Sequence, residues 1–216
     1  MKRLLGVLAL VFTAMLALSG CVNMNAEVNV TGADQATGAL QLTTHQENLQ
    51  GQKFEDVLAT QMNTDELDNI LGGQWSYTTI DDGENVGLRF ETIGKMNFVQ
   101  LQDAFMLFGF PITLSDQDGE FGFSMPGAGE VAVNEQFTEA NLQVSFPGKV
   151  LTHSAGEVDH HTVTFDMIAG ANEYKATGAA NYTMFYSLVF GGALLVLAMI
   201  LVFAFAPKSA KDSAAH

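Results

Sequence analysis

The apolar run at residues 185–206 is the feature that most constrains this chain. It reads FYSLVFGGALLVLAMILVFAFA and holds no charged residue over its 22 positions. A helix rises about 1.5 Å per residue, so the run would measure about 33 Å and cross a hydrocarbon core about 30 Å thick. A buried core helix is the alternative, but core helices rarely stay apolar on every face for so long. The run therefore predicts a transmembrane helix, which we place at residues 182–206.

The residues beside this run predict its orientation. Tyr182 and Tyr186 stand where an aromatic belt would lie, and Lys208 and Lys211 follow the run on its other side. Positive charge marks the cytoplasmic side of a membrane span. We therefore expect a cytoplasmic tail at residues 207–216, with everything before residue 182 on the extracytoplasmic face of the plasma membrane.

The N-terminus has the features of an export signal that ends in a lipid anchor. Lys2 and Arg3 precede a short apolar run, which is too short for a membrane span. The tetrapeptide Leu18-Ser19-Gly20-Cys21 then resembles the bacterial lipobox, in which cleavage precedes a cysteine that receives a diacylglyceryl group. Ordinary signal cleavage beside an incidental cysteine is the alternative. The pattern predicts a lipoprotein signal peptide at residues 1–20 and lipidation of Cys21, which is the single cysteine of the chain.

The segment between the two predicted anchors has the length of one domain and a strongly acidic composition. Residues 21–181 hold 23 of the 24 acidic residues of the chain, with five basic ones, for a net charge of −18. That balance excludes nucleic acid as a partner. It also disfavours adsorption to anionic headgroups, because such adsorption needs clustered lysine and arginine. With no second cysteine, the domain must be stabilised by core packing rather than by disulfides.

Alternating and helical patterns divide this domain into strands and two helical segments. Residues 24–31 and 39–43 alternate polar with apolar residues and predict a hairpin, with the apolar side chains of the first strand on one face. A helical period begins at Lys53 and restarts at a capping-box pattern formed by Asn63 and Glu66. Strands follow at residues 75–80 and 86–90.

A second capping-box pattern, at Asn97 and Gln100, opens a helix that places Phe98, Leu101, Phe105 and Phe108 on one face. The remaining patterns, from residue 112 to residue 165, are those of strands. The expected fold is α+β, a mostly antiparallel sheet with two helical segments on one face, followed by the C-terminal transmembrane helix.

One stretch resembles a known family. Residues 144–150 read VSFPGKV, and residues 156–158 and 162–165 follow with GEV and TVTF. This Phe-Pro-Gly-x-Val step with its following strand is similar to that of the LppM-type lipoproteins of actinobacteria, although Phe165 stands where that family often has tryptophan. The resemblance implies an α+β ectodomain comparable to lipid-binding folds, a role in the cell envelope and no established enzyme activity. At the level of residues, proline and glycine are expected to end the strand at Phe146.

The sequence offers no convincing catalytic or metal site. His153, Glu157, Asp159, His160 and His161 are close in sequence, but neighbouring residues of a strand face opposite ways. A solvated hairpin is the favoured interpretation of this cluster, with metal binding as the alternative. No nucleophile elbow or phosphate-binding glycine loop is present, so we expect no enzyme, no metal and no cofactor.

An apolar run beside the second predicted helix suggests a binding function. Residues 106–112 read MLFGFPI, which is more apolar than one helix face can bury. Core packing is the alternative. We predict a ligand site at Phe105, Phe108, Phe110 and Phe121 that contacts membrane lipid or glycolipid. A second hypothesis is an adaptor that presents a surface to another envelope membrane protein, for which Gly191-Gly192-Ala193 is the small-residue signal.

Overall fold

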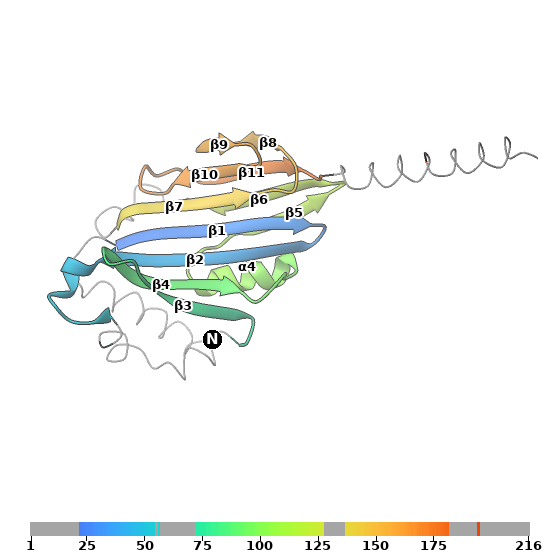
Figure 1. Ribbon diagram of the computed structural model, residues 1–216. Helices are drawn as coiled ribbons and strands as arrows, with labels where there is room; N and C mark the ends of the chain where they lie inside the picture. Colours follow the sequence, from blue (N-terminus) through green and yellow to red (C-terminus); the bar gives the residue numbers. More distant parts are fainter. Residues whose placement is uncertain (1–21, 55, 57–71, 128–136, 182–193, 195–216) are drawn as a thin grey trace, which may run out of the picture. The chain divides into compact units, whose positions relative to one another are not determined.

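The computed structural model describes residues 22–54, 56, 72–127, 137–181 and 194 (Figure 1). Within them the chain forms two β-sheets and one α-helix. The seven-stranded sheet runs, in spatial order, through β3 (Trp75–Asp81), β4 (Asn85–Thr92), β2 (Gln35–His45), β1 (Val22–Gly32), β7 (Phe137–Ser145), β10 (Thr162–Asp166) and β9 (Glu157–Asp159). The four-stranded sheet runs through β5 (Thr113–Gln117), β6 (Glu120–Pro126), β11 (Glu173–Ala179) and β8 (Val150–His153). The helices are the 3-10 turn η1 (Gln46–Leu49) and α4 (Phe98–Leu107).

Strands β1 and β2 form the hairpin that the alternating sequence predicts. Val22 lies opposite Thr44 and Val30 opposite Ala36, in antiparallel register. Along β1 every second side chain is buried, so the predicted apolar face points into the core while the asparagines and Glu27 face outward. Asp34 in the turn has a φ of 48°, a left-handed conformation that aspartate tolerates better than most residues.

Strand β1 also pairs with β7, and this pairing joins the two halves of the chain. Val22 lies opposite Phe137 and Asn29 opposite Ser145, with the strands parallel. All other strand pairs in the described part of the chain are antiparallel. A parallel pair needs a long connection, and here that connection contains β2 to β6 and α4.

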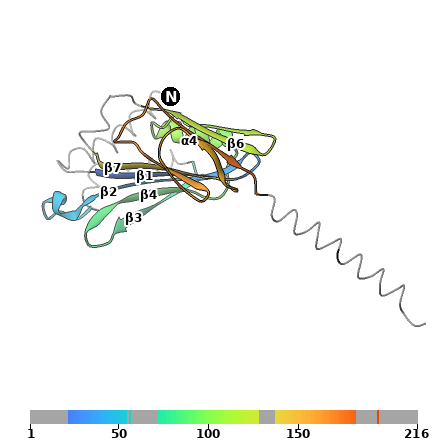
Figure 2. The ribbon, with the colours of Figure 1, turned by 90° about the horizontal axis from the view of Figure 1, so that it is seen from above.

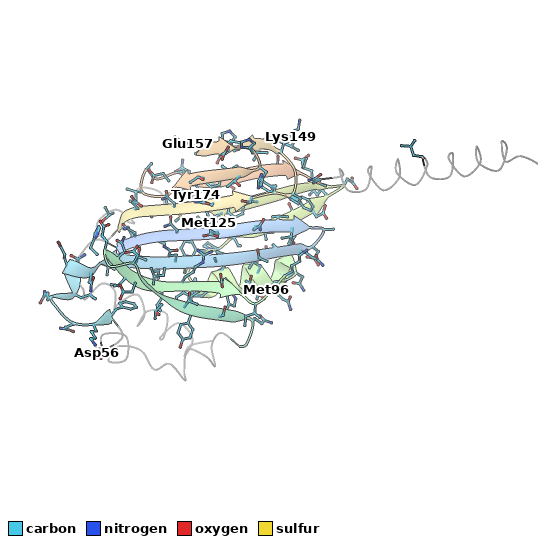
Figure 3. All side chains as sticks on the ribbon, viewed as in Figure 1. Asp56, Met96, Met125, Lys149, Glu157 and Tyr174 are labelled. Atoms are coloured by element: carbon cyan, nitrogen blue, oxygen red, sulfur yellow. The ribbon has the colours of Figure 1, made fainter. Side chains whose placement is uncertain are left out.

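Helix α4 and the four-stranded sheet lie on the same side of the seven-stranded sheet and cover its apolar face (Figure 2). The two sheets meet through aromatic rings. The ring of Phe123 on β6 stacks on that of Phe165 on β10 with centroids 6.3 Å apart, and Phe165 contacts Tyr174 on β11 edge to face at 5.5 Å. Tyr174 and Met125 face each other across β11 and β6 (Figure 3). One continuous hydrophobic core therefore runs through both sheets.

The start of α4 is fixed by hydrogen bonds from two directions. The predicted capping box is present, because Asn97 Oδ1 accepts from the N–H of Gln100 at 2.8 Å and Gln100 Oε1 accepts from the N–H of Asn97 at 3.2 Å. Asp34 in the β1–β2 turn accepts a third bond, from the N–H of Phe98 at 2.9 Å. The hairpin turn thus sets where the helix begins.

The Phe-Pro-Gly stretch carries the chain from one sheet to the other. Phe146 directly follows β7 with its side chain fully buried, and an added Cβ on Gly178 of β11 would overlap its ring. Two residues later, the N–H of Gly148 donates to the carbonyl of Ala179 at 2.8 Å, and β8 then pairs with β11. The predicted strand end is confirmed, and its partner glycine lies some thirty residues downstream.

The predicted α+β fold with one sheet, two helical segments and a transmembrane helix is wrong. The described residues are mostly strand, in two sheets, with α4 as their one α-helix, and none of their helices is long and apolar enough to cross a membrane. Most of the first predicted helical segment (57–71) and nearly all of 182–206 lie outside the described residues. The second sheet forms because β6 pairs with β5 and with β11 and not with a strand of the seven-stranded sheet, and β8, which follows Pro147 and Gly148, then pairs with β11.

We expect Gly178→Ala to lower the free energy of unfolding by about 1–3 kcal/mol, because the new methyl group must displace the buried ring of Phe146. The measurement is chemical denaturation. Gly32→Ala is the matched control, since no heavy atom of the described residues lies within 4 Å of its added Cβ. Equal stability of wild type and Gly178→Ala would contradict this packing.

Candidate functional site

Five aromatic side chains gather between α4 and the β3–β4 edge of the seven-stranded sheet, and we call them the aromatic cluster. The ring of Trp75 lies edge to face against Phe105 of α4 and against Phe108, which caps the end of α4, with centroid distances of 5.9 Å and 5.3 Å. Phe108 also contacts Phe90 at 5.5 Å, and Phe90 contacts Tyr77 at 6.2 Å. Helix and sheet are thus joined by rings in favourable geometries.

The aromatic cluster has a closed base and a partly open rim. Phe105, Phe90 and Trp75 are buried, whereas Phe108 and Tyr77 are half-buried. On the outer side of α4, Met106 is 58% exposed. The exposed Met106 and the half-buried Phe108, which are two residues apart in sequence, both present apolar surface at the end of α4 that apolar groups can cover.

One buried polar atom at the base of the aromatic cluster, the indole nitrogen of Trp75, has no hydrogen-bond partner among the described residues. The Nε1–H of Trp75 is buried, and no acceptor in the described part of the chain lies within hydrogen-bond distance of it. Buried indole N–H groups usually have a partner, because an unpaired buried donor costs about 1–3 kcal/mol. Among the described residues this donor is therefore left without a partner.

Three of the four predicted ligand residues come together here. Phe105 and Phe108 belong to the aromatic cluster, and Phe110 contacts Phe105 with centroids 6.4 Å apart. Phe121 instead lies on β6, opposite Gly178 of β11. Of the four, Phe105, Phe110 and Phe121 are core residues, with exposed fractions of 0%, 8% and 3%.

Sequence reasoning missed Trp75 and Tyr77 as members of this site. The alternating pattern predicts a strand for both, and the signal that could have singled out Trp75 is that it is the one tryptophan of the chain. Cys21 lies outside the described residues. The residue that follows it, Val22, already belongs to β1 and is buried.

A bidentate ion pair lies away from the aromatic cluster, on the outer face of the seven-stranded sheet. Both terminal nitrogens of Arg89 donate to Glu27, at 2.8 Å and 3.0 Å. The hydrogen bonds to Glu27 raise the pKa of Arg89 above its usual value, in spite of partial burial. This arginine is neutralised by a bidentate contact and so offers little to an anionic ligand.

The acid and histidine cluster forms an exposed hairpin between β9 and β10. His160 has a φ of 54° in the turn, and its Nδ1 contacts Asp159. His153 Nδ1 lies 3.4 Å from the carbonyl of Ala155, within its own loop. In the ranges that the structure describes, no three side chains of histidine, cysteine or acid converge on a point that could hold a metal ion.

Comparison with known proteins places this architecture among known folds. The family model described as the LppM domain matches residues 23–180. The folded domain of the LppM protein of Mycobacterium tuberculosis, solved by NMR, aligns with a TM-score of 0.52 and 11% sequence identity, over 75% of this chain and 92% of that one. At this identity the likeness concerns the fold alone. No curated protein matches the sequence.

We expect a chelator of divalent ions to leave the thermal unfolding midpoint of the chain unchanged, because its stability rests on the continuous apolar core. The measurement is a melting curve with and without EDTA, at constant ionic strength. A large downward shift that added zinc or calcium reverses would contradict this prediction and point back to the histidine hairpin.

Proposed function

Because the chain belongs to the LppM domain family, we propose that it is an envelope lipoprotein that binds apolar chains of membrane lipid or glycolipid at the rim of the aromatic cluster. The proposal is of a binding protein and not of an enzyme. It keeps Phe108 from the predicted ligand residues as a contact and assigns Phe105, Phe110 and Phe121 to the core that supports the contact surface.

The observation that carries the proposal is the step in exposure across α4. Over three residues the chain passes from the fully buried Phe105, through Met106, which is 58% exposed, to the half-buried Phe108. Phe108 is held from behind by Trp75 and Phe90. A ring held in this way presents its free part to a ligand with little loss of side-chain freedom, which favours binding.

The unpaired donor of Trp75 gives the site a polar element. Lipid and glycolipid molecules carry ester carbonyl, hydroxyl and phosphate oxygens beside their chains. An oxygen of this kind that reached the indole N–H would satisfy a donor that the described residues leave without a partner. A mainly apolar surface with one fixed donor is a common arrangement in lipid sites.

The charge of the domain determines where the affinity must come from. With a net charge of −18 between residues 21 and 181, the domain is not attracted to anionic headgroups. Burial of hydrocarbon supplies about 0.8 kcal/mol for each CH₂ group instead. Binding to the rim should therefore depend only weakly on salt.

We further propose that Cys21 carries the lipid anchor and that the domain lies on the extracytoplasmic face of the plasma membrane. Val22 is the first residue of β1 and is only 3% exposed. No flexible linker separates the proposed anchor from the sheet, so acyl chains at Cys21 would keep the domain close to the bilayer. That closeness raises the effective concentration of membrane lipid at the rim.

An adaptor function is the second candidate, and the dense core favours it. Phe105 and Phe121, at 0% and 3% exposure, leave no open apolar interior at these two positions. Leu151 on β8 and Val158 on β9 are 42% and 44% exposed, on strands at the margins of the two sheets. A partner protein that covered these strands would bury both side chains.

Replacement of Met106 and Phe108 by serine is expected to lower lipid binding by the intact chain about tenfold or more, because each truncation removes several apolar carbons from the contact. The measurement is the binding of a fluorescent-chain lipid at two salt concentrations. Leu151→Ser is the matched control, since it removes an exposed apolar side chain from the other edge of the fold and should change binding little.

The melting temperature of each variant shows whether its core survives. If the folded Met106→Ser and Phe108→Ser chain binds lipid as wild type does, the rim is not the site. If wild type binds lipid no better than an unrelated acidic protein does, the lipid function fails and the adaptor becomes the better account.

Cys21→Ala is expected to abolish incorporation of a fatty-acid probe, because the chain has no other thiol that could receive a diacylglyceryl group. The measurement is in-gel detection of the probe in cells that make wild type and variant at equal levels. Persistent labelling of Cys21→Ala would contradict the assignment of the anchor.

A further inference from the structure

One margin of the fold presents an edge strand of each sheet. In the described part of the chain, β8 is the last strand of the four-stranded sheet and β9 is the last strand of the seven-stranded sheet, and only residues 154–156 separate them. Every residue in the range 151–161 is exposed. An edge strand leaves a row of backbone N–H and C=O groups unpaired, and another strand can add to it. This side of the domain, which we call the β8–β9 margin, is therefore open to pairing.

The two strands of the β8–β9 margin run in opposite directions. Strand β9 is antiparallel to β10, which is antiparallel to β7, so β9 runs the same way as β7. Strand β11 also runs the same way, because its last residue, Ala179, accepts a hydrogen bond from Gly148 just beyond the end of β7. Since β8 is antiparallel to β11, it runs opposite to β9. A strand that pairs antiparallel with β8 must therefore have the direction of β9.

Basic and acidic side chains stand together at each end of the β8–β9 margin. Lys149 comes directly before β8 and Asp159 ends β9, so these two residues lie at one end. His153 ends β8 and Glu157 begins β9, and these two lie at the other end. Figure 3 shows Lys149 and Glu157 at opposite ends of this margin. Each end therefore has a basic group on the β8 side and a carboxylate on the β9 side.

These charged side chains can reach another molecule. Lys149 and Glu157 are exposed, and neither has an ion-pair partner among the described residues. Asp159 contacts the neighbouring His160, yet its side chain remains 89% exposed. Lys149 is one of five basic residues in the strongly acidic segment 21–181. A lysine without a partner in such a segment is suited to bind a carboxylate of another chain.

We propose that the β8–β9 margin joins two copies of this chain about a two-fold axis parallel to its strands. Rotation about such an axis keeps every strand direction along it and exchanges the positions of β8 and β9. Strand β8 of one copy then lies beside β9 of the other, in antiparallel direction. The four-stranded sheet of each copy continues into the seven-stranded sheet of its partner, and each contact occurs twice, as two-fold symmetry requires.

The same rotation brings opposite charges together. Lys149 of one copy meets Asp159 of the other, and His153 of one copy meets Glu157 of the other. Charge complementarity of this kind selects one arrangement among several. A two-fold axis across the strands would instead place Glu157 against Asp159, and the repulsion between these carboxylates disfavours that dimer.

The centre of this contact is apolar and small. Leu151 of β8 and Val158 of β9 are exposed large apolar side chains, and they lie between the charged ends of the margin. Strands of four and three residues, paired twice, form an interface of the size found in weak, reversible complexes. The inference does not depend on lipid binding. It assigns the margin to a second copy of the chain, whereas the adaptor function would assign it to a different protein.

The experiment is sedimentation equilibrium of the intact chain in density-matched detergent. The salt concentration is about 0.15 M, where a Debye length of about 8 Å limits the general repulsion between two acidic domains. Wild type is expected to show a reversible equilibrium between monomer and dimer. Lys149→Asp and Asp159→Lys should each weaken the dimer about tenfold or more, because each turns two attractive pairs into two repulsive ones. An equimolar mixture of the two variants should regain wild-type association, since the heterodimer pairs lysine with aspartate at both positions.

Lys95→Asp and Glu120→Lys are the matched controls, because each reverses one exposed charge outside the β8–β9 margin. Both should keep the dimer constant of wild type, and a melting curve of each variant confirms that it is folded. A wild-type chain that stays monomeric at the highest soluble concentration overturns the proposal and leaves the margin to a different protein. A dimer that both single variants retain, or that their mixture does not restore, also overturns it.

Discussion

The pairing of β1 with β7 is the interaction on which the rest of the structure depends. On one side of it lie β2, β4 and β3, and on the other side β10 and β9, so the seven-stranded sheet would separate into two pieces without it. Strand β1 is suited to this position because every inward side chain from Val22 to Val30 is apolar and buried. A slip by one residue would turn that apolar set outward, which fixes the register strongly.

Local sequence signals predicted the local structure well. The β1–β2 hairpin follows from alternation, and the start of α4 follows from Asn97 and Gln100, whose side chains bond to backbone three residues away. The pairing of Val22 with Phe137 and the packing of Phe146 on Gly178 were not predictable in this way. They depend on contacts between segments that are distant in sequence, and a local sequence pattern does not identify the partner segment. The second sheet was missed for the same reason.

Local sequence patterns were limited in the same way at the candidate site. Helical spacing placed Phe98, Leu101 and Phe105 on one face of α4, and all three are buried. The spacing could not show that Phe108, on the same face, stays half-open because Trp75 meets it from β3. Nor could an apolar pattern separate Phe121, which packs in the other sheet, from the rings beside α4.

The positions of the two ends of the folded domain determine how it would respond to mechanical load. Val22 begins β1 at one end of the sheet, whereas Ala179 ends β11 beside Gly148, past the far end of β7. A pull on these two ends acts along the strands and not across them. The hydrogen bonds that β1 makes to β2 and β7 would then be loaded together in shear, instead of opening one after another. The domain should in this way resist extension with its longest strand pairs.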